Sequence, residues 1–245
     1  MIADYPIPGL EETGFVTSDD ILKMREAPKS IIVLGAGAVA VELAQFLLRI
    51  GVNVTLLQRS SHILSKGDED LAQPLESKLR EEGMDLYIST KILRAEKKSE
   101  GSAIYFQHKG KEKQVHAQFI LQALGRKPHT DGLQLKSAGV DTQKDRIPVD
   151  AKMKTNQPHI FAVGDVNGIH EVVHIAIQQG EIAGYNSMHP ESEREMDDRL
   201  KASVVFTDPA VASVGLSEKE CQAGNIAYLT ASYSFDDHGK SMCLG

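Results

Sequence analysis

The sequence predicts an α/β fold in which a Rossmann-type domain, built on a parallel sheet, forms the centre of the chain. Between residues 31 and 57, two short apolar runs typical of buried strands flank a segment with helical spacing of its apolar residues. Gly35, Gly37 and Ala40 join the first strand to the helix with the spacing G-x-G-x-x-A. Strand, glycine turn, helix and second strand in this order indicate a dinucleotide-binding unit.

Each small residue of the glycine turn has a separate role in such a unit. Gly35 can adopt the tight turn, Gly37 lets a pyrophosphate approach the backbone, and Ala40 lets the helix lie close to the sheet. The phosphates would then accept hydrogen bonds from free N–H groups at the helix N-terminus. The alternative is an ordinary buried strand–turn–helix whose glycines serve its geometry alone. The candidate cofactor contacts in this segment are Gly35, Ala36, Gly37, Ala38, Val39, Ala40 and Glu42.

The end of the second strand predicts which dinucleotide binds. NAD sites usually carry an Asp or Glu roughly twenty residues after the glycines, but this chain has Gln58, Arg59 and Ser60 there, with Lys66 shortly after. A carboxylate would repel a 2′-phosphate, whereas a guanidinium can bind it in fork geometry. We therefore predict NADP rather than NAD, with Gln58, Arg59 and Ser60 among the contacts. The alternative is that Arg59 is an ordinary solvated surface residue.

Composition and charge exclude several classes of function. The chain has 245 residues, 41% hydrophobic and 25% charged, which suffices for a globular core. Its net charge of −7 argues against nucleic acid as a partner. No charged-then-apolar leader follows Met1 and no apolar run approaches the length of a membrane span, so we expect a cytoplasmic protein without a membrane segment. Cys221 and Cys243 show no redox or metal-binding spacing.

The rest of the chain shows alternating helix and strand patterns. Residues 1–28 lack strong periodicity and are predicted to be a connecting segment with one short helix after Ser18. A helix is expected over residues 68–82, with its regular part starting near Pro74. The remaining expected strands and helix have the ranges 86–89, 92–96, 103–108 and 113–117 (the last two as a hairpin), 119–124, 159–163, 175–185 (the helix), 203–209 and 211–214.

Two of these strands end in glycine turns, and ligands of α/β sheets bind at the carboxyl ends of the strands. The strand from Phe119 runs into Gly125, and the strand 159–163 runs into Gly164 and Asp165. These glycines and Asp165 are therefore added to the candidate site.

A zinc hydrolase is a rival from a different class, because residues His170 to His174 match H-E-x-x-H. On a helix this pattern places two histidines on one face as zinc ligands. However, Gly168 lies just before His170, so the first histidine would sit at or before the helix start. We therefore expect no metal site here.

Four blocks of the sequence together resemble the pyridine nucleotide–disulfide oxidoreductases, the family of dihydrolipoamide dehydrogenase, mercuric reductase and glutathione reductase. Their order and spacing match that family from about Pro6 to the end of the chain. The blocks are GAGAVAVE (35–42), ALGRKP (123–128), IFAVGD (160–165) and FTDPAVASVG (206–215).

The resemblance implies roles for residues in each block. The glycine turn and Gly125 would bind the pyridine nucleotide, and Asp165, with Gly164, would hold a ribitol hydroxyl or nearby flavin oxygen of FAD. The backbone near Val173 would approach the flavin. Ile92, in the expected strand 92–96, is included as a further cofactor contact. Some relatives carry a large residue at the position of Ala38 that gates the nicotinamide pocket, which alanine cannot do.

The resemblance also implies a domain order, in which a partial FAD-domain segment and the start of an α+β dimer-interface domain follow the Rossmann-type domain. The expected ranges are 1–28 (connecting segment), 29–146 (NAD(P)-binding domain), 147–198 (returning FAD-domain segment) and 199–245 (start of the interface domain). The family's first FAD-binding motif and its Cys-x-x-x-x-Cys disulfide would precede Met1, and its His-x-x-x-x-Glu pair would follow Gly245.

The function that the resemblance implies is hydride transfer from NADPH to FAD, and then to a disulfide or similar acceptor, in a homodimeric enzyme. Because the redox cysteines and the His/Glu pair are missing, we expect the chain by itself to be inactive. No residue of the chain is assigned as catalytic. The alternative is a catalytically silent nucleotide-binding module.

Overall fold

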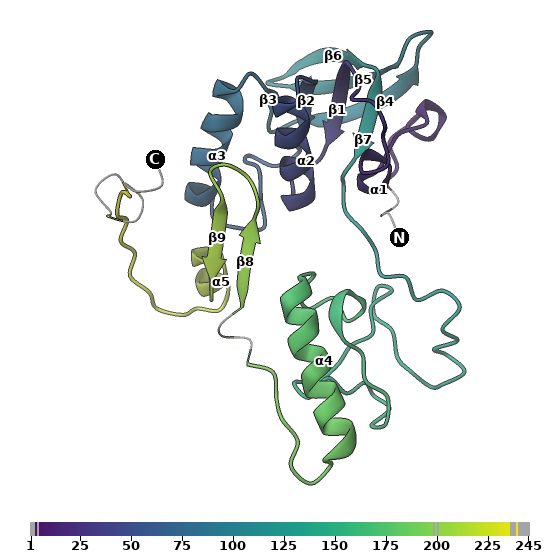
Figure 1. The fold of residues 1–245 in the computed structure, drawn as a ribbon, viewed down its shortest axis with the longest axis vertical. Helices are drawn as coiled ribbons and strands as arrows, with labels where there is room; N and C mark the ends of the chain where they lie inside the picture. The colour runs from purple at the N-terminus through teal and green to yellow at the C-terminus, as the bar shows by residue number, and fades with distance from the viewer. Residues whose placement is uncertain (1–2, 4, 198, 200, 236–238, 240–245) are drawn as a thin grey trace. The chain divides into compact units, whose positions relative to one another are not determined.

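The computed structural model describes residues 3, 5–197, 199, 201–235 and 239. The chain divides into two compact units, one reaching Gly215 and the other beginning at Leu216. The first unit contains a parallel sheet with its covering helices, then a long irregular stretch and one long helix (Figure 1).

A four-stranded parallel sheet forms the centre of the first unit, in the order β3-β2-β1-β7. Its strands are β1 (Ser30–Leu34), β2 (Asn53–Leu57), β3 (Asp85–Tyr87) and β7 (Phe119–Gln122). β1 pairs with β2 on one side and with β7 on the other. Its four apolar residues are fully buried, as expected for a strand covered on both faces. The predicted α/β fold with a parallel sheet is confirmed.

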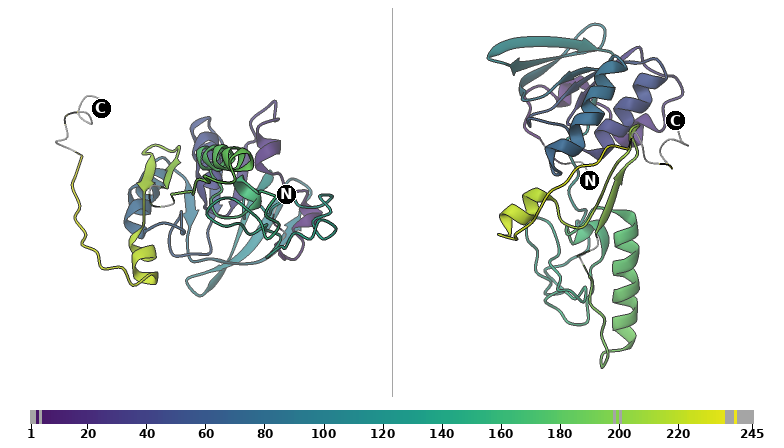
Figure 2. Two further views of the ribbon diagram at one scale, coloured as in Figure 1. Left: turned by 90° about the horizontal axis from the view of Figure 1, so that it is seen from below. Right: turned by 90° about the vertical axis from the view of Figure 1, so that its left-hand side faces the viewer.

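Two helices cover one face of this sheet, α2 (Ala38–Arg49) and α3 (Glu69–Glu81) (Figures 1 and 2). Their buried residues pack with alternate strand residues, among them Val33, Leu56 and Leu121, in one core cluster. The alternation follows from the two-residue period of a strand, which sends neighbouring side chains to opposite faces.

The start of α3 differs from the sequence-based expectation. The helix begins at Glu69, and Pro74 lies inside it. Proline there removes one backbone donor. Ala72 and Leu75, on either side of it, are fully buried against the core, so packing stabilises the turn that proline weakens. The expectation of a regular helix starting near Pro74 is wrong for this reason.

A three-stranded antiparallel sheet covers the other face, in the order β4-β5-β6 (Figure 2). Its apolar residues form a second core cluster with those residues of the parallel sheet whose side chains point to this face, such as Ile32 and Ile120. β5 and β6 form the expected hairpin, whose turn residues Lys109 and Gly110 both have positive φ angles, 50° and 75°. The strands are β4 (Lys91–Lys97), β5 (Ser102–His108) and β6 (Lys111–Ala117).

Residues 123–163 form no helix or ladder-forming strand, and the strand expected over 159–163 is wrong. An isolated bridge joins Phe161 to Lys154. The run is apolar enough for a strand, and its backbone does pair with residues 153–155, since Thr155 N donates to Ile160 O at 3.0 Å and Ala162 N donates to Met153 O at 3.1 Å. This pairing amounts to a single bridge and does not extend into a ladder. The chain continues into a 3₁₀ turn, Gly164–Val166, and helix α4 (Val173–Met188).

The remaining elements are short. Helix α1 (Ser18–Ile21) is capped by Thr17 and Asp20, and a 3₁₀ turn, Glu11–Thr13, precedes it. β8 (Ala202–Val205) and β9 (Val211–Val214) pair in antiparallel fashion at the end of the first unit. The second unit contains helix α5 (Glu218–Ala223). Within the described part of the chain, no helix combines the length and apolar character that crossing a bilayer requires.

Candidate functional site

The carboxyl ends of β1, β2 and β7 lie at the same edge of the sheet, because the three strands are parallel. The strand order reverses at β1, whose sequence neighbour β2 lies on one side and the much later β7 on the other. Ligands of α/β sheets bind at such a switch point. The turns that follow the strands are joined here, since Ala123 N donates to Leu34 O at 3.0 Å and Gly35 N donates to Leu57 O at 2.9 Å.

The glycine turn between β1 and α2 fits closely against the turn after β7. Gly35 has a φ of 97°, and a Cβ on it would lie 2.6 Å from Ala123 O. Both the backbone conformation and the close approach therefore require glycine at this position. Ala36 and Ala40 are each 1% exposed and belong to the core cluster beneath α2.

Gly37 has a different environment. It is the N-cap of α2, its φ is −75°, and a Cβ built on it would meet no atom within 4 Å. Gly37, Ala38 and Val39 are exposed, and the N–H groups of a helix's first turn have no acceptor within the helix. This turn therefore offers open donors at the positive end of the helix dipole, which suits a pyrophosphate.

Two predicted residues in the turn after β2 have different environments: Arg59 is exposed to solvent, whereas Gln58 forms hydrogen bonds within the turn. Gln58 is 7% exposed; its Oε1 accepts a hydrogen bond from Arg59 N at 3.0 Å, and its Nε2 donates to His62 O at 3.4 Å. Its amide therefore shapes the turn. Arg59 is exposed, and its guanidinium has no hydrogen bond or ion pair with the described residues. Ser60 is partly buried, and its carbonyl accepts a hydrogen bond from Ser89 N.

Three other predicted contacts lie around this edge or in the adjoining sheet. Gly125 is exposed with a φ of 124°, and a Cβ there would meet nothing within 4 Å. Glu42, one turn into α2, accepts a hydrogen bond from Phe206 N at 2.8 Å. Ile92 lies in β4, where it packs partly buried against the second core cluster.

A second group of predicted residues surrounds the start of α4. Gly164 is buried with a φ of 73°, Asp165 is exposed directly after it, and Val173, the first residue of α4, is 76% exposed. The turn is fixed by a residue that the motif analysis missed. Gln179 Oε1 accepts hydrogen bonds from Gly164 N at 2.7 Å and from Asn167 Nδ2 at 2.8 Å.

Gln179 is fully buried, so this amide forms a rigid support behind the exposed carboxylate. The motif around Gly164 does not point to it, because it lies fifteen residues after Gly164. The regular spacing of α4 alone could have identified it as an inward-facing polar residue.

The zinc pattern is not assembled on one helix. His170 precedes α4, whereas His174 lies in its first turn, and the His174 Nε2 atom is 3.0 Å from Ala202 O. The described residues contain no group of three or more His, Cys, Asp or Glu side chains placed to hold a metal ion.

A family model and the similar known proteins indicate the same family for this chain. The family model "Pyridine nucleotide-disulphide oxidoreductase" matches residues 2–180. A mercuric reductase of Staphylococcus aureus is 33% identical over 217 residues, which is 88% of this chain and 40% of the relative. A dihydrolipoyl dehydrogenase of Bacillus subtilis (strain 168) is 30% identical over 239 residues, 98% of this chain and 51% of the relative.

A similar solved structure is the HOCl-induced flavoprotein disulfide reductase RclA from Escherichia coli. It matches with a TM-score of 0.79 at 27% identity, and the match covers 91% of this chain and 51% of the other. The chain thus spans about half the length, or less, of these relatives.

Proposed function

The chain belongs to the pyridine nucleotide–disulphide oxidoreductase family, and from that premise we propose that it binds NADPH as the nucleotide-binding part of a flavin-dependent oxidoreductase. The observation that carries the proposal is the open glycine turn at the switch point. A Cβ on Gly37 would meet nothing within 4 Å, although the neighbouring Gly35 is packed against Ala123 O. Space beside free helix donors is what a pyrophosphate requires.

The residues of this chain would bind and orient the nucleotide. The backbone donors from Gly37 to Ala40 hold the pyrophosphate, and the open backbone at Gly125 lets the nicotinamide half approach the end of β7. Arg59 binds the 2′-phosphate, a contact that NADH does not offer. Its unpartnered guanidinium supports NADPH as the preferred nucleotide.

The family's members use FAD together with NAD(P)H. FAD, when bound, would supply the redox chemistry, namely acceptance of hydride from a reduced nicotinamide and onward transfer of electrons. In this chain Asp165 would hold a ribitol hydroxyl, with the Gly164 turn and the backbone near Val173 beside it. The buried support from Gln179 fits this role, because it fixes the turn while the carboxylate stays exposed.

The electron acceptor is proposed as a class, a disulfide or a similar group. Cys221 and Cys243 lack the spacing of a redox pair, so no cysteine of this chain is assigned to the step. The proposal includes a homodimeric, cytoplasmic enzyme and the domain ranges 1–28, 29–146, 147–198 and 199–245. The competing proposal is a silent module that binds the nucleotide without passing electrons on.

Calorimetric titration of the purified chain with NADPH and NADH tests the nucleotide site. We expect binding of both, with NADPH tighter; no binding of either would contradict the proposal. Titration with FAD should show weak binding, because a partial site loses contacts while the ordering cost remains. Asp165→Ala should weaken it further. A chain that purifies with one tightly held FAD would contradict this account.

A second assay separates the enzyme from the silent module. The chain is mixed with NADPH, excess FAD and ferricyanide as electron acceptor, and NADPH oxidation is followed by absorbance against FAD and ferricyanide without the chain. Oxidation above that background supports a flavin-dependent reductase. Nucleotide binding without oxidation is expected both of the silent module and of a reductase chain that is inactive by itself, so oxidation above the background is the outcome that excludes the silent module.

A further inference from the structure

The loop that contains Arg59 is held by hydrogen bonds to several neighbouring parts of the first unit. We define it as residues 58–66, between β2 and α3. Gln58 N donates to Tyr87 O at 2.8 Å at its start, and Leu64 N donates to Ala36 O, in the glycine turn, at 2.8 Å near its end. The loop thus has a fixed base, while Arg59 itself is exposed.

One of these hydrogen bonds involves the side chain of a helix residue that is distant in sequence. Glu76, in α3, accepts a hydrogen bond from Ile63 N through its Oε1 atom at 2.9 Å. Ile63 is fully buried, and Leu64 next to it has a φ of 49° in the left-handed region. The chain therefore bends sharply at a buried point, where the backbone N–H of Ile63 needs an acceptor. Glu76 supplies that acceptor.

We propose that Glu76 is a positioning residue for nucleotide choice, which holds the 58–66 loop in the conformation that presents Arg59 to the 2′-phosphate. This inference rests on the proposed function. NADPH and NADH share every group except that phosphate, so the glycine turn and the start of α2 bind both alike. A loop that must first be ordered reduces the affinity of the ligand that needs it. Loss of the Glu76 contact should therefore weaken NADPH binding and leave NADH binding unchanged.

The test compares dissociation constants for NADPH and NADH, measured by calorimetry, in four variants of the full chain. Glu76→Leu removes the acceptor and should reduce the NADPH preference roughly five- to tenfold. Glu76→Gln keeps an oxygen that can accept the same bond, so it should retain the preference. Glu76→Asp withdraws the carboxylate by one methylene and should lose the preference even if Glu76→Leu does not fold. Gln73→Leu, an exposed change on the same helix, is the matched control.

The ratio of the two constants is decisive, because a merely structural role would weaken both nucleotides equally. Equal weakening, or a preference that survives both Glu76→Leu and Glu76→Asp, would overturn this inference and leave the proposed function standing. Equal binding of NADPH and NADH by the unchanged chain would instead overturn the proposed cofactor preference, and this inference with it.

Discussion

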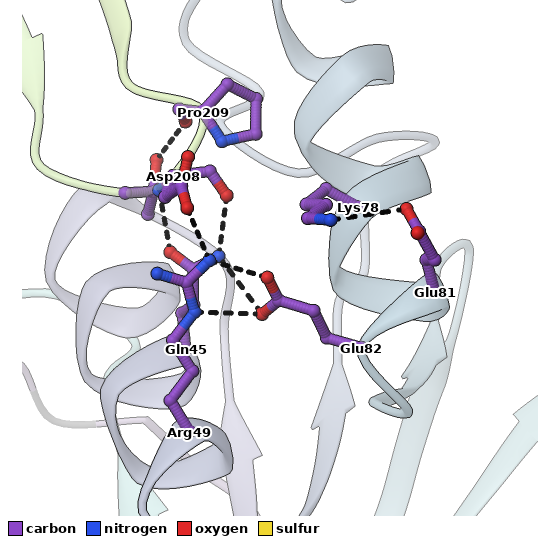
Figure 3. Close-up of polar contacts among 8 residues, drawn as sticks. Gln45, Arg49, Lys78, Glu81, Glu82, Asp208 and Pro209 are labelled. Carbon is purple, nitrogen blue, oxygen red and sulfur yellow. Dashed lines mark hydrogen bonds and ion pairs between the residues drawn. The ribbon is translucent and has the colours of Figure 1, made fainter. Parts of the chain in front are cut away.

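The guanidinium of Arg49 joins the ends of helices α2 and α3 through the carboxylate of Glu82. Arg49 Nη2 lies 2.5 Å from Glu82 Oε1, and Nε lies 3.2 Å from Oε2 (Figure 3). The same Nη2 atom lies 2.7 Å from Asp208 Oδ2, and Gln45 exchanges two hydrogen bonds with the backbone of Asp208. Three segments distant in sequence are thus held together at one point.

This arrangement predicts a pH-dependent contribution of Glu82 to stability. Hydrogen bonding from Arg49 is the main cause that holds the pKa of Glu82 below its ordinary value, against an opposing effect of burial. A carboxyl whose pKa is lowered in the folded state contributes stability above its unfolded pKa, and loses it as the pH falls through the folded pKa. We expect Glu82→Gln to lower the free energy of unfolding by about 1 kcal/mol near neutral pH, measured by urea denaturation.

Glu81→Gln provides the control for this measurement. The side chain of Glu81 is 73% exposed and its carboxylate lies 3.4 Å from Lys78 Nζ, so loss of the charge should change stability little. The deficit of Glu82→Gln should shrink as the pH falls. A deficit that is the same at every pH, or equal to that of Glu81→Gln, would contradict the assigned role.

The two glycines of the nucleotide turn should respond differently to the same substitution. Gly35→Ala places a Cβ 2.6 Å from Ala123 O at a φ of 97°, so we expect a loss of stability of about 1–3 kcal/mol or more. Gly37→Ala places its Cβ in open space, so the fold should survive nearly unchanged. The same methyl would stand where a pyrophosphate approaches, and binding should fall.

Thermal unfolding and NADPH titration, carried out on both variants, check this pair. The expected pattern is reduced stability for Gly35→Ala, and near-native stability with weakened nucleotide binding for Gly37→Ala. Undiminished NADPH affinity in Gly37→Ala would show that the pyrophosphate does not lie against this turn.

Charge reversal at Arg59 should change the nucleotide preference. Arg59→Glu replaces a cation that can pair with a phosphate by an anion that repels it. We expect NADPH affinity to fall by roughly tenfold to a hundredfold, and NADH to become the preferred ligand. Lys23→Glu makes the same change in net charge at another exposed position and should leave the preference intact. If both variants reduce NADPH affinity equally, the effect is one of general charge, and Arg59 is not a specific contact.

Substitution of the buried Gln179 should reduce the free energy of unfolding, whereas the same substitution of the exposed Gln178 should not. Gln179→Leu leaves the buried Gly164 N–H and Asn167 Nδ2 without their shared acceptor, at a cost of about 1–3 kcal/mol. Gln178→Leu makes the same change at an exposed position one residue earlier and should have little effect. Urea denaturation of both variants measures the difference. Equal stabilities would mean that the turn before α4 does not depend on this amide.

Local pattern predicted the elements that form the nucleotide-binding unit. The strand, glycine turn and helix between residues 31 and 57 follow from the hydrophobic period and from the positive φ that glycine adopts at position 35. Both are properties of neighbouring residues. The family resemblance read from four short blocks is confirmed by the family match over residues 2–180.

The expectations that failed depend on partners distant in sequence. Residues 159–163 are apolar enough for a strand, but in the described part of the chain they form a single bridge, from Phe161 to Lys154, and no ladder. Pro74 normally marks a helix start, yet burial of Ala72 and Leu75 carries α3 through it.

The sequence by itself determined the fold class, the family and the positions of the motif residues, because each depends on short-range spacing. The tertiary structure decided that the Gln58 side chain folds the loop and that Gln179 supports the turn before Asp165. It also brought Glu76 to the buried bend at Ile63. These roles arise from hydrogen bonds to backbone groups. Because almost every residue type carries the same backbone donor and acceptor, the sequence does not show which residue provides them.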